Sequence, residues 1–186
     1  MGAARLAWAL AAAGWAAAAM ALAVAGAARR TASTDALTGL PNRRALAAAF
    51  RADRGQRRLA FLDLSGFRAV NAAHGHAVGD SILVAVARRL EAGLPRGSAL
   101  FRHGGDEFVV LAPPGADIGA ALAGALASPF PLPDGSSVRL GLWLGTAPAG
   151  TRPLDTALGA AIADMARRRG AAQTGAAPAS AQVQSG

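Results

Sequence analysis

A short apolar run that contains one carboxylate constrains this 186-residue chain more than any other feature. The run is Leu59 to Leu64 (LAFLDL), and Ser65-Gly66 follows it. Its length and continuous apolar character predict a buried central strand, with Asp63 near the carboxyl end. A carboxylate in such a strand is costly unless it is paired, hydrogen-bonded or bound to a metal. A fold built on this strand therefore needs a partner for Asp63.

A second acidic group lies at the tip of a predicted hairpin. Two apolar runs flank Gly104-Gly105, and Asp106-Glu107 comes directly after the glycines. A Gly-Gly turn needs positive φ angles, which glycine adopts freely, and it lets phosphates approach the backbone. Taken alone, a strand aspartate is more often structural, and such a hairpin is ordinary. If strand and hairpin are neighbours, Asp63 meets Asp106, and their oxygens together with substrate phosphates suit Mg²⁺.

The rest of the sequence predicts helices that alternate with short strands. Asn42 is expected to cap a helix that runs to about Arg54, and a short helix is expected over Phe67–Asn71. Ala72–Gly79 is predicted to be a loop that contains glycine and histidine. The other expected elements are a helix over Asp80–Leu94, hairpin strands over Ala99–Arg102 and Phe108–Leu111, a helix over Ala116–Ala127, a strand over Val138–Leu144 and a helix over Leu154–Arg169. One domain over 31–170 accommodates all of them.

Residues 1–30 are predicted to form a separate membrane anchor. No charged or strongly polar residue occurs from Leu6 to Ala28, a run that as a helix spans about 30 Å of hydrocarbon. Arg29 and Arg30 close the run and place the domain in the cytoplasm by the positive-inside tendency. We therefore expect a single-pass protein of the inner (cytoplasmic) membrane that contacts lipid through residues 6–28. A cleaved signal peptide and a soluble helix are the alternatives, since Ala25-Gly26-Ala27 resembles a cleavage site and much of the run is alanine.

Composition excludes several classes of protein. No cysteine is present, which excludes a disulfide framework, a zinc–thiolate site and a cysteine nucleophile. The net charge of +8 reflects 19 basic residues, all of them arginine, that are scattered in pairs without an aromatic platform beside them. We therefore expect no nucleic-acid partner. Residues 171–186 lack the apolar surface needed to fold and are predicted to be a disordered tail.

Three motifs together resemble the GGDEF family of diguanylate cyclases. The string DALTGLPNRR begins at Asp35, and the spacing NxxxGHxxGD runs from Asn71 to Asp80. The string RHGGDEF runs from Arg102 to Phe108. The likeness covers about residues 33–170.

This resemblance implies an α+β fold (broadly α/β), a nucleotidyl-cyclase palm whose mostly antiparallel central sheet is surrounded by helices. Members of the family condense two GTP molecules into cyclic di-GMP. Each subunit of a homodimer presents one GTP to the other, and Mg²⁺ (or Mn²⁺) neutralises the phosphates. The resemblance therefore implies an enzyme with GTP as substrate and a metal cofactor.

Site roles follow from the same motif match. Asp63 and Asp106 correspond to metal ligands, joined by the backbone carbonyl of Leu64. Glu107 is a candidate base or second metal contact. Arg68 stands where the family usually has a lysine near the triphosphate, and it keeps the charge.

Substrate recognition falls to a second set of residues in this match. Asn71 and Asp80 resemble the guanine readers, because an amide and a carboxylate can pair with the acceptor and donor groups of guanine. His76 corresponds to a position at which the family contacts substrate. These three residues are the predicted substrate-binding set.

Departures from the family pattern point to an alternative. Ser65 replaces the usual second aspartate, and Trp143 in Gly141–Gly145 replaces a small residue of a strand that commonly reads SIGIA, so it needs space. The last helix has lost its tyrosine, although one of Arg167–Arg169 can serve the phosphates. The alternative is a degenerate, catalytically inactive GGDEF domain that binds GTP or a protein partner. The retained acidic residues favour the enzyme.

An inhibitory RxxD motif, which many diguanylate cyclases carry just before the hairpin, is absent. The corresponding positions read Pro95-Arg96-Gly97-Ser98, and no carboxylate occurs between Glu91 and Asp106. Arg96 lacks the partner that would pair with the base of a bound product. We therefore expect no RxxD product-inhibition site.

Overall fold

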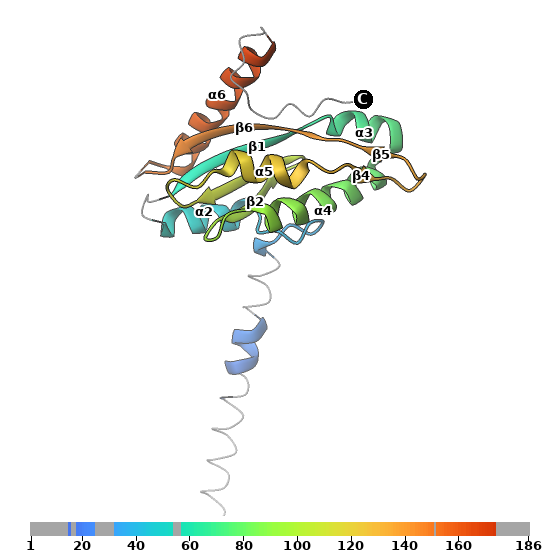
Figure 1. Ribbon diagram of the computed structural model, residues 1–186. Helices are drawn as coiled ribbons and strands as arrows, with labels where there is room; N and C mark the ends of the chain where they lie inside the picture. The colour runs from blue at the N-terminus through green and yellow to red at the C-terminus, as the bar shows by residue number, and fades with distance from the viewer. Residues whose placement is uncertain (1–14, 16–17, 25–31, 54–56, 151, 174–186) are drawn as a thin grey trace, which may run out of the picture.

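The protein folds around a four-stranded antiparallel sheet that has helices on both faces (Figure 1). The computed structural model describes residues 15, 18–24, 32–53, 57–150 and 152–173. The strand order is β2-β3-β1-β6. These strands are β2 (Ala99–Gly104), β3 (Glu107–Ala112), β1 (Arg58–Ser65) and β6 (Gly141–Pro148). The expected α+β fold with an antiparallel sheet and surrounding helices is confirmed.

Strand β1 lies in the interior of the sheet, as its apolar sequence predicts. It pairs with β3 on one side and with β6 on the other. Alternate side chains of a strand point to opposite faces, so Phe61 packs into one half of the core and Leu62 into the other. Both are at most 2% exposed. Burial on both faces explains why the run shows no alternation of apolar and polar residues.

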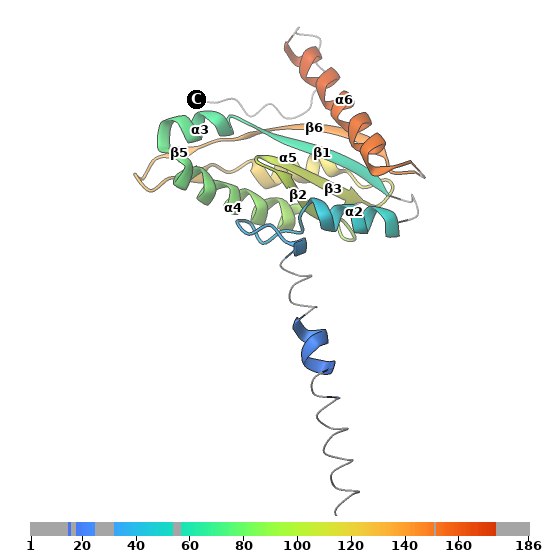
Figure 2. The ribbon, with the colours of Figure 1, turned by 180° about the vertical axis from the view of Figure 1, so that it is seen from behind.

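Helices cover the two faces of the sheet in separate groups (Figures 1 and 2). One group is α3 (Phe67–His74), α4 (His76–Gly93) and α5 (Ile118–Leu126), which pack with Leu62 and its neighbours. The other is α2 (Arg43–Ala52) and α6 (Leu154–Gln173), which pack with Phe61. A small hairpin of β4 (Phe130–Pro131) and β5 (Ser137–Val138) completes the domain.

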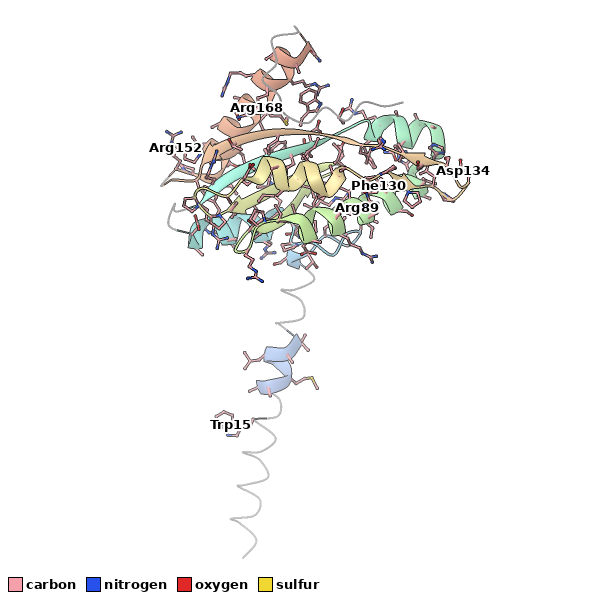
Figure 3. The ribbon with its side chains drawn as sticks, in the orientation of Figure 1. Trp15, Arg89, Phe130, Asp134, Arg152 and Arg168 are labelled. Atoms are coloured by element: carbon pink, nitrogen blue, oxygen red, sulfur yellow. The ribbon has the colours of Figure 1, made fainter. Side chains whose placement is uncertain are left out.

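Local contacts fix the ends of these elements. The Asn42 side chain accepts hydrogen bonds from the backbone N–H groups of Arg44 and Ala45, so it caps α2 as predicted. Arg89 of α4 fastens the small hairpin, because its guanidinium lies 4.0 Å from the centre of the Phe130 ring (Figure 3). The same guanidinium donates hydrogen bonds to backbone carbonyls just before β4.

The predicted loop over Ala72–Gly79 is wrong. Helix α3 continues to His74 and α4 begins at His76, so that Gly75 alone separates them. Gly75 has φ 80° and ψ 165°, a conformation that glycine adopts without the steric cost of a Cβ. One residue is therefore enough to break the helix, and the residues around it extend both neighbours.

Two other predicted boundaries are also wrong. The strand predicted over Val138–Leu144 is divided, because β5 ends at Val138 and β6 begins at Gly141. Leu140 between them is fully buried, so its apolar character reflects core packing rather than one continuous strand. Helix α6 runs to Gln173, past its predicted end at Arg169, and Gly170 lies inside it.

The N-terminal segment is described only in part. Residues 18–24 are helical, and the side chains of Trp15, Met20, Leu22 and Val24 are exposed. Within the described residues, the structure contains no helix that combines the length and the apolar character needed to cross a membrane. The predicted span over 6–28 lies mostly outside those residues, and the predicted tail lies outside them beyond Gln173.

Candidate active site

Three side chains meet on one face of the sheet at the end of β1. Asp63 pairs with Glu107 of β3 and with Trp143 of β6. Residues directly opposite each other in antiparallel strands point to the same face, with Cβ atoms about 4.5–5.5 Å apart. Phe61, two residues before Asp63, packs with α2 and α6, so this is the face that those helices cover. The hairpin thus lies beside β1, and the acidic side chains of both meet.

Asp63 is half-buried and lies among charges of both signs. Burial raises the pKa of Asp63 above its ordinary value, and the negative charges of Asp106 and Glu107 raise it further. The positive charges of Arg169 and Arg68 act in the opposite direction and are outweighed. Burial and two neighbouring carboxylates disfavour the charged form of Asp63, so a cation at this position is favoured.

The hairpin turn consists of Gly105 and Asp106 rather than of the two glycines. Gly104 still belongs to β2 and pairs with Glu107. Of the two glycines only Gly105 has a positive φ, of 48°. The predicted Gly-Gly turn is therefore wrong by one residue, because the register shifts between Arg102 and Gly104. The shift places Asp106 at the tip of the hairpin.

An ion pair connects the hairpin to the turn that begins at Asp35. The Nη1 atom of Arg102 lies 2.8 Å from Asp35 Oδ1, and its Nε and Nη2 atoms donate to the Gly105 carbonyl at 3.1 and 2.7 Å. Thr38 donates to the same Asp35 oxygen through its N–H and its hydroxyl. Partial burial acts to raise the pKa of Asp35, but the hydrogen bonds from Thr38 and Arg102 outweigh it and lower that pKa.

A shallow pocket of about 350 Å³ lies beside this ion pair. It is lined by Asp35, Asn42, Arg43, Arg44, Arg102, His103, Gly104 and Gly105. The pocket opens at the backbone of the hairpin, whereas the carboxylates gather around Asp63. We place the candidate catalytic centre at Asp63, because the charges that can bind a cation are there.

His103 is a member of the site that sequence reasoning missed. Its Nδ1 atom lies 3.2 Å from Glu107 Oε2, and since a carboxylate only accepts, Nδ1 carries the proton in this contact. The ring packs edge-on against Phe61, with centroids 5.6 Å apart. The available signal in the sequence was a histidine inside the RHGGDEF motif, four residues before Glu107.

Asn71 and Asp80 lie where α3 and α4 meet. A Cβ on Gly79 would collide with Asn71 Oδ1, so the close contact of the two helices requires glycine there. Asn71 Oδ1 is buried and has no hydrogen-bond donor among the described residues. Buried polar atoms normally have a partner, so this acceptor suits the N–H group of a ligand. Asp80 is exposed next to Gly79, and His76 is exposed one turn earlier on α4.

Helix α6 brings cations to the Asp63 end of the sheet. Asp164 accepts a hydrogen bond from the Thr146 N–H and forms ion pairs with Arg167 and Arg168, each at 2.9 Å. Arg169 lies elsewhere, with its guanidinium carbon 5.6 Å from the centre of the Trp143 ring. Of the three arginines, Arg169 is therefore the one whose charge acts on Asp63.

Trp143 is half-buried on β6, so its ring has the space that we expected it to need. The crowded position of the strand is Gly145, where a Cβ would collide with the Ala161 carbonyl and with the backbone N–H of Met165. Two residues along β6 from Gly145, Trp143 lies on the same face under the next turn of α6. The indole is half-buried there, beside Asp63.

The donor set at this site fits magnesium. Carboxylate and carbonyl oxygens, such as those of Asp63, Asp106 and the Leu64 backbone, are the hard ligands that Mg²⁺ prefers. Among the described residues, no group of three or more acidic or histidine side chains is arranged to hold a metal ion. Mg²⁺ does not require one, since it commonly takes one or two carboxylates together with substrate phosphates and water. The residues fit an ion that binds together with a nucleotide.

Comparison with known proteins agrees with the motifs. The family model described as "Diguanylate cyclase, GGDEF domain" matches residues 32–128, so β6 and α6 lie beyond the match. The diguanylate cyclase TpbB of Pseudomonas aeruginosa is 39% identical over 127 residues, which are 61% of this chain and 29% of TpbB. The chain spans between 12% and 29% of the length of the first curated relatives that it matches.

Solved structures agree with the observed fold. A structure of TpbB from Pseudomonas aeruginosa that comprises only the GGDEF domain is 33% identical, with a TM-score of 0.62. The match covers 72% of this chain and 87% of that one. Diguanylate cyclase SiaD of the same species, in complex with its activator SiaC, is 25% identical over 92% of this chain and 70% of its own, with a TM-score of 0.69. Motifs, fold and comparisons agree, and the chain belongs to the GGDEF family of diguanylate cyclases.

Proposed function

We propose that the protein is a diguanylate cyclase that joins two GTP molecules into cyclic di-GMP with Mg²⁺ (or Mn²⁺). The observation that carries the proposal is the meeting of Asp63 with Asp106 and Glu107 at one end of the sheet. A domain that served only as a scaffold would have no need for a half-buried aspartate whose pKa two neighbouring carboxylates raise.

The chemistry is the attack of a ribose 3′-hydroxyl on the α-phosphate of a second GTP, which forms a phosphodiester bond, breaks the bond between the α- and β-phosphates and releases pyrophosphate. Asp63, Asp106 and the carbonyl of Leu64 would hold the metal. Bound there, Mg²⁺ would neutralise the charge that develops on the phosphates. Glu107 lies opposite Asp63 in the sheet, and we assign it the role of the base that takes the hydroxyl proton or of a further metal contact. Arg68, exposed on α3, adds positive charge near the triphosphate.

Guanine recognition falls to the junction of α3 and α4. The Asn71 carbonyl oxygen is buried without a donor among the described residues, which suits an N–H group of guanine. Asp80 next to it offers two more acceptor oxygens, and His76 lies one turn earlier as a further substrate contact. Because these groups are acceptors, we expect the double variant Asn71→Ala/Asp80→Ala to lose its preference for GTP over ATP.

The reaction requires two subunits. Each carries one GTP, and the two must face each other for the 3′-hydroxyl of one to reach the α-phosphate of the other. We propose a homodimer whose association depends on residues 1–30. The small side chains in that segment permit close helix packing.

We also propose that residues 6–28 anchor the protein in the inner membrane, with the GGDEF domain in the cytoplasm. The support is the uninterrupted apolar run and the arginines that follow it. Cell fractionation of the full chain and of residues 31–186 tests the anchor. Full-length protein that fractionates with soluble proteins, or a fully active 31–186 monomer, would contradict this part of the proposal.

Activity is tested by incubating the full chain with GTP and Mg²⁺ and measuring cyclic di-GMP by mass spectrometry. We expect product from the wild type and none from Asp106→Asn, whose carboxylate lies at a hairpin tip and can be lost without a core cavity. Normal melting of the variant shows that its fold is intact. GTP binding without product in the wild type would identify the inactive, nucleotide-binding alternative.

A further inference from the structure

Trp143 is the least expected member of the site, because a large aromatic ring lies directly opposite the catalytic aspartate. It pairs with Asp63 across β1 and β6, and its ring lies 5.6 Å from the guanidinium carbon of Arg169. A guanidinium at this distance from an indole face is attracted by the negative face of the ring. The Trp143 ring thus lies next to Asp63 in the sheet and also contacts the guanidinium of Arg169.

The geometry of α6 explains why Arg169 reaches this ring. Ala161 and Met165 lie against Gly145, and the absence of a side chain at 145 lets the helix approach β6 closely. Residues four apart occupy the same face of a helix, so Arg169 follows Met165 on the face that meets the sheet. Two residues apart on β6, Trp143 and Gly145 share the opposing face. The contact between Arg169 and Trp143 follows from the contact at Gly145.

The neighbouring arginines are held in a different place. Arg167 and Arg168 both pair with Asp164, which also accepts the Thr146 N–H. Arg169 forms no ion pair within the part of the chain that the structure describes, and it is exposed. Its guanidinium lies over the ring of Trp143, which pairs with Asp63 across β1 and β6. A cation that is free to bind an anion therefore lies beside the site, and Trp143 holds it there.

We propose that Trp143 is a positioning residue that holds Arg169 at the Asp63 end of the sheet, where the guanidinium binds the triphosphate of GTP. The inference rests on the proposed function for the identity of the nucleotide. Guanidinium binds phosphate through charge and paired N–H groups, and stacking on an indole leaves those N–H groups free at the edge of the plane. Trp143 thereby holds the guanidinium of Arg169 in place and leaves its N–H groups available for phosphate. A carboxylate partner would hold the same guanidinium but would occupy those N–H groups.

The experiment measures the dissociation constants of a non-hydrolysable GTP analogue and of GMP by calorimetry on the full chain with Mg²⁺. The variants are Arg169→Ala, its matched control Arg168→Ala, Trp143→Leu and Trp143→Phe. We expect Arg169→Ala to weaken binding of the analogue about tenfold and Arg168→Ala to leave it unchanged. Trp143→Leu is expected to weaken it about threefold, and Trp143→Phe to stay within about twofold of wild type, because phenylalanine keeps a ring face. GMP affinity is expected to be the same in all five proteins.

Three results would overturn the inference. Equal weakening by Arg169→Ala and Arg168→Ala would show that general positive charge, not a placed cation, attracts the triphosphate. Equal losses in Trp143→Phe and Trp143→Leu, or a matching loss of GMP affinity, would show that Trp143 acts by packing alone. These readouts need no turnover. A wild type that binds the analogue but makes no cyclic di-GMP would contradict the proposed function and leave the inference standing.

Discussion

Asp35 and Arg102 form an ion pair of 2.8 Å although 67 positions of the chain separate them. The same guanidinium donates two hydrogen bonds to the Gly105 carbonyl, in the turn that carries Asp106. The DALTGLPNRR motif and the RHGGDEF motif are therefore one structural unit. Through these contacts Arg102 connects the turn that begins at Asp35 to the hairpin that carries Asp106, the proposed metal ligand.

Replacing Arg102 is expected to damage activity more than stability. Arg102→Lys keeps the charge but cannot bond Asp35 and the Gly105 carbonyl together, because an ammonium lacks the planar fork of a guanidinium. We expect a loss of about 1–2 kcal/mol in the free energy of unfolding, measured with urea, and a fall in cyclic di-GMP synthesis of at least about tenfold. Arg88→Ala, an exposed arginine on α4, is the control. Full activity in Arg102→Lys would show that the hairpin keeps its place unaided.

Neutralising Asp63 is expected to stabilise the metal-free fold while abolishing catalysis. The pKa of Asp63 is raised in the folded protein, so the native state binds its proton more tightly than the unfolded state does. The charged form therefore costs stability at neutral pH, and this cost disappears as the pH falls towards 3.8, the ordinary pKa of an aspartate. Asp63→Asn should melt above wild type at pH 7 in EDTA, and the difference should shrink at pH 4.

Activity of Asp63→Asn should fall by about 100-fold or more, since a metal ligand is lost. Glu91→Gln, an exposed carboxylate on α4, serves as the control for charge alone. A lower melting temperature for Asp63→Asn than for wild type at pH 7 would mean that the carboxylate stabilises the fold through a partner, contrary to the pKa direction.

Gly79→Ala is expected to disturb nucleotide binding through Asn71. An added Cβ collides with Asn71 Oδ1, so the amide must leave its place between α3 and α4. We expect a loss of about 1–3 kcal/mol in stability and a clear rise in KM for GTP. Gly159→Ala in α6 is the matched control, because a Cβ there meets nothing within 4 Å and a helix favours alanine over glycine. Equal KM values for the two variants would refute the role of Asn71 in binding.

The product is expected not to inhibit the enzyme strongly through the region before the hairpin. Arg96 is exposed in the turn between α4 and β2, and the segment from 92 to 105 has no carboxylate to pair with a base. Titration of cyclic di-GMP into the GTP reaction checks this. Micromolar noncompetitive inhibition that disappears in Arg96→Ala would contradict the prediction.

Several features of the molecule follow from local sequence. The apolar run around Leu62 predicted an interior strand, because burial on both faces leaves Asp63 as the one polar residue from 59 to 64. Asn42 caps α2, because a side-chain acceptor placed just before a helix satisfies free N–H groups wherever the helix packs. The order and spacing of acidic and glycine residues were enough to identify the family. These signals depend on neighbours within a few positions of the chain.

Other features depended on contacts between distant segments. The register of β2 on β3 moved the turn to Gly105 and Asp106, and the close approach of α6 at Gly145 placed Arg169 over Trp143. No local pattern distinguishes Arg169 from the two arginines before it, because all three have the same intrinsic chemistry. Their roles differ only because Asp164 binds two of them and the face of α6 directs the third to the sheet. Sequence thus determined which groups the site contains, and tertiary packing decided which of them meet.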